Sequence, residues 1–185
     1  MLGELQKRKL IKLFSMYDTC NIGTLKFSDF EKIVETLAEV KGWKSNSTEY
    51  TQLLNKFTNR WVHLKGNIQD RVGGHAMYKV QLKDWLNYHE FMLDDVAKYE
   101  DEIHTLADMI FDVCDVDDSG HLDQNEWVAL FRAFNLPVVY AGDAFVSLDQ
   151  DRDNLLQKEE VLSALRDFYY SDDAGTPANF MFGPY

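Results

Sequence analysis

Two stretches of twelve residues in this 185-residue chain repeat one pattern of oxygen-bearing side chains. They span residues 115–126 and 149–160, so the second begins 34 residues after the first. In both, side-chain oxygens occupy positions 1, 3 and 5, an apolar residue occupies position 8 and Glu occupies position 12. Gly120 and Asn154, at position 6, tolerate the positive φ of a sharp turn. The repeat therefore requires two loops that each close around a cation at a fixed interval.

The two stretches match the EF-hand loop, in which six to eight oxygens surround one Ca²⁺ ion at about 2.3–2.6 Å. Position 7 contributes its backbone carbonyl, and the Glu at position 12 binds through both oxygens. We therefore expect two bound Ca²⁺ ions, with Mg²⁺ as a competitor. The predicted metal ligands are Asp115, Asp117, Ser119, His121, Asp123 and Glu126 in the first loop, and Asp149, Asp151, Asp153, Leu155 and Glu160 in the second.

Apolar residues flank both loops at the spacing of helices that bury one face, which is i, i+3, i+4 and i+7. Around the first loop they are Ala107, Ile110, Phe111 and Cys114, then Trp127, Leu130, Phe131 and Phe134. Around the second loop they are Ala141, Ala144, Phe145 and Leu148, then Val161, Ala164, Leu165 and Phe168. Each loop is therefore predicted to lie between two helices.

Residues 18–29 carry a damaged copy of the same loop between helical flanks. Cys20 puts a soft sulfur at position 3, Ile22 offers no ligand at position 5, and Asp29 is one methylene shorter than the usual Glu at position 12. We expect a structural loop here, and whether it binds any ion stays open.

A fourth unit departs further from the pattern. Helical spacing predicts one helix that ends near Leu64 and another that includes Trp85. Residues 65–79 between them contain a single acid, Asp70, and are too long and too basic for a calcium loop. This unit is interpreted as structural only.

These units predict a compact all-α fold of four EF-hand helix–loop–helix units, numbered hands 1 to 4 in chain order. The residues at position 8 should form short β bridges between paired loops, Leu25 with Val80 and Leu122 with Leu156. We expect three parts, which are residues 1–92 with the degenerate hands 1 and 2, residues 93–170 with the calcium-binding hands 3 and 4, and a C-terminal tail of residues 171–185 that packs on both lobes.

The acidic residues are concentrated in the half that holds the intact loops. The net charge is −12, but residues 1–92 hold 14 Lys and Arg against 10 Asp and Glu, whereas residues 93–185 hold 5 against 21. Such an acidic chain is a poor partner for nucleic acid, because phosphates require a basic surface. The carboxylates favour calcium ions as the partners instead.

Other classes of protein find little support in the sequence. No segment has the roughly 18–20 apolar residues of a membrane span, and the N-terminus lacks the apolar stretch of a signal peptide, so we expect a cytoplasmic protein and a monomer.

Cys20 and Cys114 are expected to be free thiols. Because no glycine-rich phosphate loop, nucleophile motif or HExxH occurs, we do not expect an enzyme.

With these residues placed, nearly the whole chain resembles the calexcitin and sarcoplasmic calcium-binding protein family, with the calcium-triggered photoproteins as more distant relatives. The resemblance rests on the two intact loops, residues 5–11, Trp61 and Leu64, Trp85 and Leu86, residues 168–173 and residues 178–183. It implies a compact intracellular protein that buffers Ca²⁺ and Mg²⁺ or acts in calcium signalling. In many members hand 1 binds and hand 4 has decayed. Here the reverse holds, so the number of sites is not carried over.

Two roles remain open, a calcium buffer and a sensor that opens to bind a target protein. The apolar segment of residues 180–182 can fill a groove from within, which favours a compact buffer or a self-occluded sensor. A calcium-regulated carrier of an apolar, luciferin-like ligand is a third alternative, suggested by the photoprotein branch. Its candidate lining residues, which helical spacing favours as core residues, are Trp43, Trp61, Trp85, Trp127 and His89.

Overall fold

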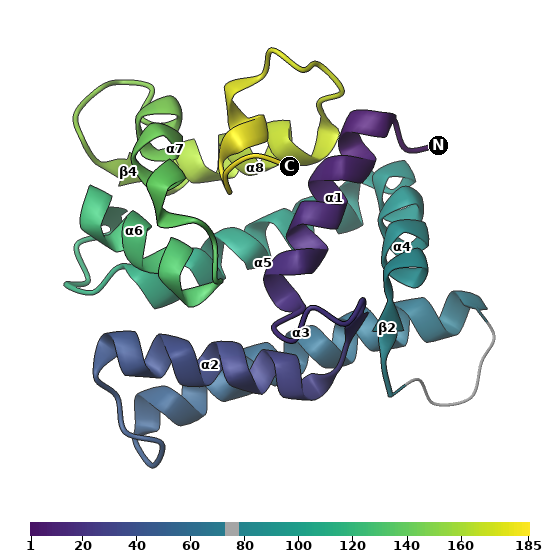
Figure 1. Ribbon diagram of the computed structural model, residues 1–185, viewed down its shortest axis with the longest axis horizontal. Coiled ribbons are helices and arrows are strands. Elements are labelled where there is room, and N and C mark those ends of the chain that lie inside the picture. The colour runs from purple at the N-terminus through teal and green to yellow at the C-terminus, as the bar shows by residue number, and fades with distance from the viewer. Residues whose placement is uncertain (73–77) are drawn as a thin grey trace.

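The computed structural model describes residues 1–72 and 78–185, without the side chains of residues 70–72, 96 and 98. Its elements are, in order, α1 (Glu4–Tyr17), β1 (Thr24–Leu25), α2 (Phe27–Lys41), α3 (Thr48–Val72), β2 (Val80–Gln81), α4 (Leu82–Asp94), α5 (Val96–Cys114), β3 (His121–Leu122), α6 (Gln124–Ala133), η1 (Val138–Tyr140), α7 (Ala141–Leu148), β4 (Leu156–Gln157), α8 (Lys158–Tyr170) and η2 (Pro177–Phe180). Among the described residues, no helix is both long and apolar enough to cross a membrane. The predicted all-α fold is confirmed (Figure 1).

Two short antiparallel strand pairs join the loops. β1 pairs with β2 through Leu25 and Val80, and β3 pairs with β4 through Leu122 and Leu156. All four side chains are fully buried. The predicted pairing of the position 8 residues is therefore confirmed, and it fixes the loops of hands 3 and 4 side by side.

Hand 2 departs from the expected helix boundary. We expected residues 65–79 to connect two helices, but α3 continues past Leu64 as far as Val72. The reason is that Ile68, one turn after Leu64, is also buried and extends the apolar face of the helix into the core. The side chain of Asp70, the one acid of this stretch, lies outside the described residues.

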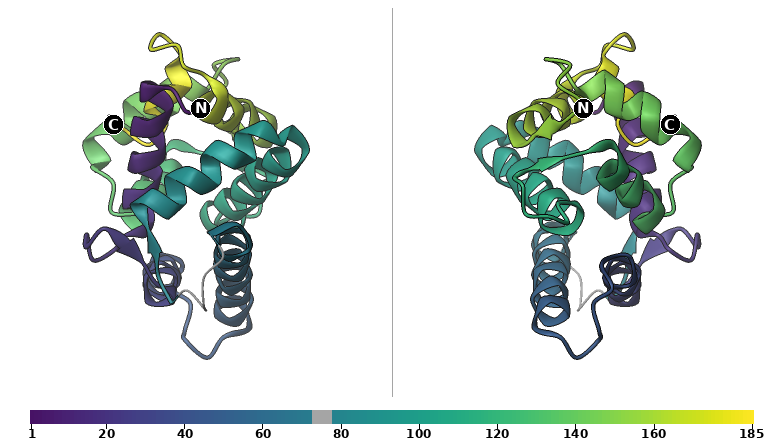
Figure 2. Two further views of the ribbon diagram at one scale, coloured as in Figure 1. Left: turned by 90° about the vertical axis from the view of Figure 1, so that its right-hand side faces the viewer. Right: turned by 90° about the vertical axis from the view of Figure 1, so that its left-hand side faces the viewer.

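One apolar core runs through the described part of the chain. α2 packs against α3, α5 against α8 and α6 against α7, while α1 contacts both α4 and α8. The two chain termini lie at the same end of the molecule, and α2 and α3 lie at the opposite end (Figures 1 and 2). Because α1 and α8 come from opposite halves of the chain, the core is continuous across residue 92, and the two-lobe boundaries stay a prediction.

The C-terminal tail lies over hand 4. η2 contacts α7 and α8, and Met181 and Phe182 just after it are almost fully buried. The Phe182 ring meets the edge of Phe168 in α8, with ring centroids 5.3 Å apart. Phe180 differs from its neighbours because it stays 47% exposed. Two of the three apolar residues of the segment 180–182 therefore contribute to the core.

His89 in α4 is enclosed by aromatic side chains. The residue is 3% exposed, its Nδ1 lies 3.0 Å from the hydroxyl oxygen of Tyr99, and its ring packs against Trp85 at a centroid distance of 4.4 Å. Burial, with a smaller effect of the Arg60 guanidinium, lowers the pKa of His89 from 6.5 to about 3. In the folded protein the imidazole is therefore neutral at pH values near 6.5, at which an exposed His would titrate.

Acid should destabilise the protein through this residue. The unfolded chain protonates His89 near the ordinary pKa of 6.5, whereas the folded chain does so only near a pKa of about 3. Between these values the unfolded state binds the additional proton, so stability falls as pH decreases. In the calcium-free protein we expect His89 to contribute a loss of about 2–3 kcal/mol between about pH 7.5 and pH 4.5.

Urea unfolding at a series of pH values measures this loss. His89→Gln removes the titrating group but keeps a polar side chain beside Tyr99, and its stability should vary less steeply with pH than that of the wild type. His63→Gln, at an exposed position of α3, should keep the wild-type slope. Parallel profiles for the wild type and His89→Gln would contradict the prediction.

Candidate metal centre

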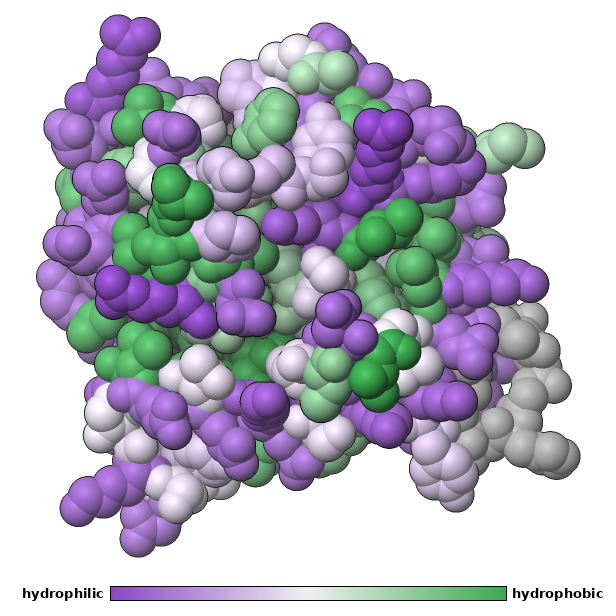
Figure 3. Space-filling view, in the orientation of Figure 1, coloured by the Kyte–Doolittle hydropathy of each residue, from purple (hydrophilic) through white to green (hydrophobic). Residues whose placement is uncertain are grey.

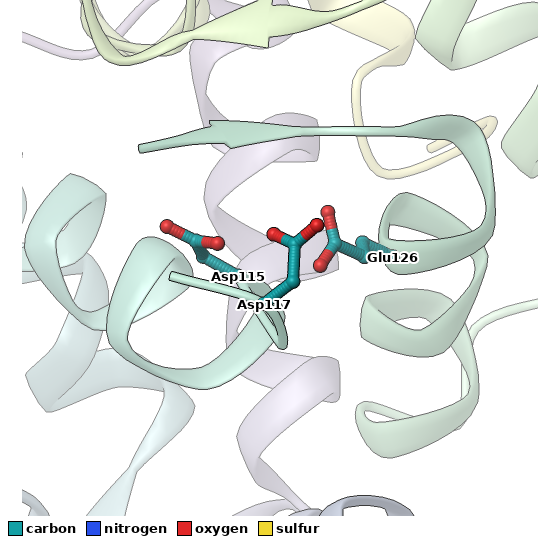
Figure 4. A group of neighbouring side chains, drawn as sticks. All are labelled: Asp115, Asp117 and Glu126. Carbon is teal, nitrogen blue, oxygen red and sulfur yellow. The ribbon is translucent and has the colours of Figure 1, made fainter. Parts of the chain in front are cut away.

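The loop of hand 3 brings three carboxylates together between α5 and α6. Asp115 directly follows the last residue of α5, and Glu126 lies in the first turn of α6. Oxygens of Asp115, Asp117 and Glu126 all lie within 4.8 Å of one another. Figure 4 shows these carboxylates gathered between the loop and the start of α6. Carboxylate oxygens that converge in this way suit a hard divalent cation.

Backbone N–H groups of the loop hold these carboxylates in place. The N–H of Gly120, which has a φ of 80°, donates to Asp115 Oδ2 at 2.9 Å. At the other end, the N–H groups of Val116 and Asp123 donate to the two oxygens of Glu126 at 2.6 and 3.0 Å. The protein's own donors therefore draw the first and last ligands of the loop toward each other.

The remaining predicted ligands of hand 3 have different positions. Ser119 Oγ donates to the backbone carbonyl of His121 at 3.0 Å and lies 3.4 Å from Asp115 Oδ1, so this hydroxyl and carbonyl are inside the loop. Asp123 Oδ1 instead accepts the N–H of Glu126 at 2.8 Å and caps α6. Position 9 commonly reaches the ion through water, which is compatible with this capping role.

Hand 4 also gathers three carboxylates, between α7 and α8, but they come from positions 1, 3 and 5 and do not include Glu160. Oxygens of Asp149, Asp151 and Asp153 lie within 4.8 Å of one another. The N–H of Asn154, which has a φ of 65°, donates to Asp149 Oδ2 at 3.0 Å. Glu160 Oε1 accepts the N–H at loop position 2 at 2.8 Å, as Glu126 does in hand 3. Both loops thus have the same hydrogen-bonded frame.

The chemistry of hand 4 fits a divalent cation. Oδ1 of Asp149 is buried and has no hydrogen-bond partner among the described residues. A hydrogen bond from the Asp153 N–H lowers the pKa of Asp151, but desolvation and the neighbouring carboxylates outweigh it and raise the pKa overall. A bound cation would relieve this repulsion, and a set of carboxylate and carbonyl oxygens suits Ca²⁺ or Mg²⁺.

The structure adds one candidate that the sequence reasoning missed. Gln157 occupies position 9 of the second loop, where hand 3 has Asp123. Its Nε2 donates to Asp153 Oδ2 at 2.8 Å, and its Oε1 is buried without a hydrogen-bond partner among the described residues. Aligning the two loops position by position would have found it. The Leu155 N–H also donates to Asp153, at 2.8 Å.

The loop of residues 18–29 holds the carboxylates at its two ends with hydrogen bonds from the protein. Asp18 accepts the N–H groups of Ile22 and Gly23 at 3.1 and 2.7 Å. Asp29, buried like Asp18, accepts the Thr19 hydroxyl at 2.7 Å and a backbone N–H at the start of α2 at 2.7 Å. These hydrogen bonds resemble those of Asp115 and Glu126, but among the described residues no third His, Cys or acidic side chain joins Asp18 and Asp29 in a cluster. The structural role of hand 1 stays a prediction.

Four helix–loop–helix units joined in pairs by short strands, with two loops of converging carboxylates, define an EF-hand protein. No family model matches the chain.

Comparisons with known proteins agree with this class. The chain is similar to calerythrin from Saccharopolyspora erythraea, at 24% identity over 162 residues that cover 88% of this chain and 90% of calerythrin. Among solved structures, the calcium-loaded apo form of the coelenterazine-binding protein from Renilla muelleri has a TM-score of 0.73 at 17% identity and covers 100% of both chains. A calcium-binding protein from Streptomyces coelicolor has a TM-score of 0.65 at 20% identity, over 89% of this chain and 97% of that one.

At these identities the solved structures show a shared fold. Calerythrin is a sarcoplasmic calcium-binding protein family member, so the resemblance predicted from the sequence is confirmed.

Proposed function

We propose that this chain binds two Ca²⁺ ions reversibly, one in the loop of residues 115–126 and one in the loop of residues 149–160, and acts as a calcium buffer. The observation that carries the proposal is the convergence of carboxylates within 4.8 Å in each of these loops. Similarity to calerythrin and to calcium-binding proteins of known structure supports it. Mg²⁺ is expected to compete for the same oxygens.

The tail supports a buffer over an open sensor. A sensor exposes an apolar groove when it binds Ca²⁺, whereas a buffer hardly opens. Here Met181 and Phe182 of the same chain are buried against hand 4. A groove at this position is therefore filled from within.

One observation favours the sensor alternative. Val138, Val139 and Tyr140 of η1 and Val146 of α7 are all exposed, with Val139 at 79% and Val146 at 70%. Figure 3 shows apolar side chains at the surface on the side where η1 and α7 lie. A target protein could cover these residues, and dye binding by the intact protein, described in the Discussion, separates the two roles.

In the part of the chain that the structure describes, the aromatic residues proposed to line a ligand cavity fill the core instead, although one of the similar structures is named as coelenterazine-binding. Trp61, Trp85, Trp127 and His89 are buried in the core, and Trp43 packs at its edge. The cavity beside Trp85 and His89 has a volume of about 10 Å³, which is about the room that one water molecule needs. A hollow of about 530 Å³ between α3 and α5 is larger, and although most of its lining residues are polar or charged, most of its exposed lining surface is apolar.

Calorimetric titration of the full chain with Ca²⁺, with and without Mg²⁺, tests the proposed function. We expect two ions per chain, with dissociation constants between about 10⁻⁸ and 10⁻⁵ M. Mg²⁺ should weaken the apparent affinity without changing the number of sites. Three tight sites would show that residues 18–29 bind as well, and a chain that takes up no calcium would refute the proposal. A cytoplasmic location, a monomeric state and a non-enzymatic role stay predictions.

A further inference from the structure

The first turns of α1 lie against the end of α8, more than 160 residues away in sequence. Gln6 and Lys9 are three residues apart and therefore share one face of α1. Gln6 Nε2 donates to the carbonyl of Tyr170 at 3.1 Å, and Lys9 Nζ donates to the carbonyl of Ser171 at 2.7 Å. The last carbonyls of a helix have no donors within the helix. Side chains of α1 thus cap the C-terminal end of α8.

The segment that follows α8 also places a charged side chain beside the start of α1. The carboxylate of Asp172, just after α8, lies so close to Gly3 at the start of α1 that a Cβ on Gly3 would be 2.2 Å from Asp172 Oδ2. A negative charge at the N-terminus of a helix is favourable, because the unpaired N–H groups there carry partial positive charge. The segment after α8 therefore places a negative charge beside the N-terminus of α1.

Lys9 anchors this contact within the core. It is 1% exposed, and its Nζ also donates to Asn179 Oδ1 in the tail at 3.0 Å. Burial lowers the pKa of Lys9 to about 8, and the charges of Asp172 and Asp167 partly oppose this. An ammonium group buried in this way requires its acceptors, so α1, the end of α8 and the tail are held as one unit.

The other end of α8 carries a predicted calcium ligand. Glu160 lies in its first turn, with Oε1 bound to the N–H of Gln150 at 2.8 Å and Oε2 bound to the N–H of Gln157 at 3.0 Å. The helix of 13 residues is about 20 Å long and continuous, so its two ends share one axis. Its orientation therefore sets where the Glu160 carboxylate lies relative to Asp149 at the start of the loop.

We propose that Gln6 and Lys9 are positioning residues for the calcium site of hand 4. This inference rests on the proposed function. By fixing the end of α8, they keep Glu160 turned toward its loop before the ion arrives. Without them α8 occupies other orientations for part of the time. The apparent dissociation constant of hand 4 then rises as the inverse of the fraction of chains in which Glu160 faces its loop. α1 belongs to hand 1. A helix of one hand would in this way raise the calcium affinity of another, hand 4.

The test isolates each hand in the full chain. Glu126→Gln leaves hand 4 as the intact site, and Glu160→Gln leaves hand 3. Lys9→Met, which keeps an apolar stem but removes the ammonium, is introduced into both backgrounds, and calcium affinity is measured below the melting transition. We expect affinity to fall by about three- to tenfold in hand 4 and to change by less than about twofold in hand 3.

Two further variants complete the design. Gln6→Met removes the donor to Tyr170 and the acceptor of the Gly3 N–H, which lies 2.9 Å from Gln6 Oε1, and should weaken hand 4 in the same direction if Lys9→Met fails to fold. Lys7→Met, on the same helix but paired with the exposed Glu4, should leave both hands unchanged.

Three results would overturn the inference. Unchanged affinity of hand 4 in both Gln6→Met and Lys9→Met excludes a positioning role, and equal weakening of the two hands indicates a general structural role. A Glu126→Gln chain that binds no calcium would instead refute the proposed function of hand 4, and the inference with it.

Discussion

Replacing Glu126 by Gln is expected to abolish calcium binding at residues 115–126, and Glu160→Gln is expected to do the same at residues 149–160. The Glu at position 12 provides two oxygens and a full negative charge, whereas Gln provides one neutral oxygen. Each Glu also closes its loop through two backbone N–H groups, which a single amide oxygen cannot accept in the same way. We expect affinity at the altered loop to fall by about 100-fold or more, since even partners outside the coordination shell contribute 10- to 100-fold.

Calorimetry then shows one ion per chain for each variant and no tight binding for the double variant. Glu159→Gln is the matched control, because Glu159 neighbours Glu160 but is exposed and occupies no ligand position. It should bind two ions as the wild type does. If Glu126→Gln or Glu160→Gln still titrates with two sites of undiminished affinity, the assignment of that loop is wrong.

Deleting residues 174–185 is expected to lower stability by several kcal/mol. The deletion removes the buried side chains of Met181 and Phe182, and burial of each such side chain contributes about 1.5–3 kcal/mol. It also removes Asn179, an acceptor of the buried Lys9 ammonium. The groove along α7 and α8 then faces water, so the calcium form of the truncated protein should bind more of a hydrophobic dye than the intact protein.

Single substitutions in the tail distinguish the loss of buried side chains from the shortening of the chain. Phe182→Ala should reproduce most of the loss, because Phe182 is 1% exposed, whereas Phe180→Ala should cost little at 47% exposure. Dye fluorescence of the intact protein should stay low with and without calcium. Strong dye binding by the intact protein on addition of calcium, with no further increase after truncation, would refute the buffer and indicate an open sensor.

The helix–loop–helix repeats and the strand pairs were predictable because their determinants are local. A loop that encloses one ion repeats its ligand types at fixed positions, so Asp115 to Glu126 could be aligned with Asp149 to Glu160 residue by residue. The apolar residue at position 8 then gave the pairing of Leu122 with Leu156, which the structure confirms.

The other features of the fold depend on contacts between residues far apart in the sequence, which no local pattern encodes. The extension of α3 to Val72 is stabilised by burial of Ile68 against distant parts of the core, although the sequence after Leu64 resembles a polar connection. The caps that Gln6 and Lys9 provide for α8 join residues more than 160 positions apart. No local pattern predicts that Lys9 is buried, since a buried Lys is rare unless acceptors surround it.

The pairing of α1 with α8 also sets an order of events during synthesis. Lys9 leaves the ribosome 162 residues ahead of Ser171, whose carbonyl it binds in the folded protein. At about 5–20 residues per second, this separation lasts about 8–32 s. During this interval the N-terminal helix has no α8 to pack against, so the nascent chain cannot complete its core. Although α1 is made before α8, it is therefore among the last of the described helices to reach its final contacts.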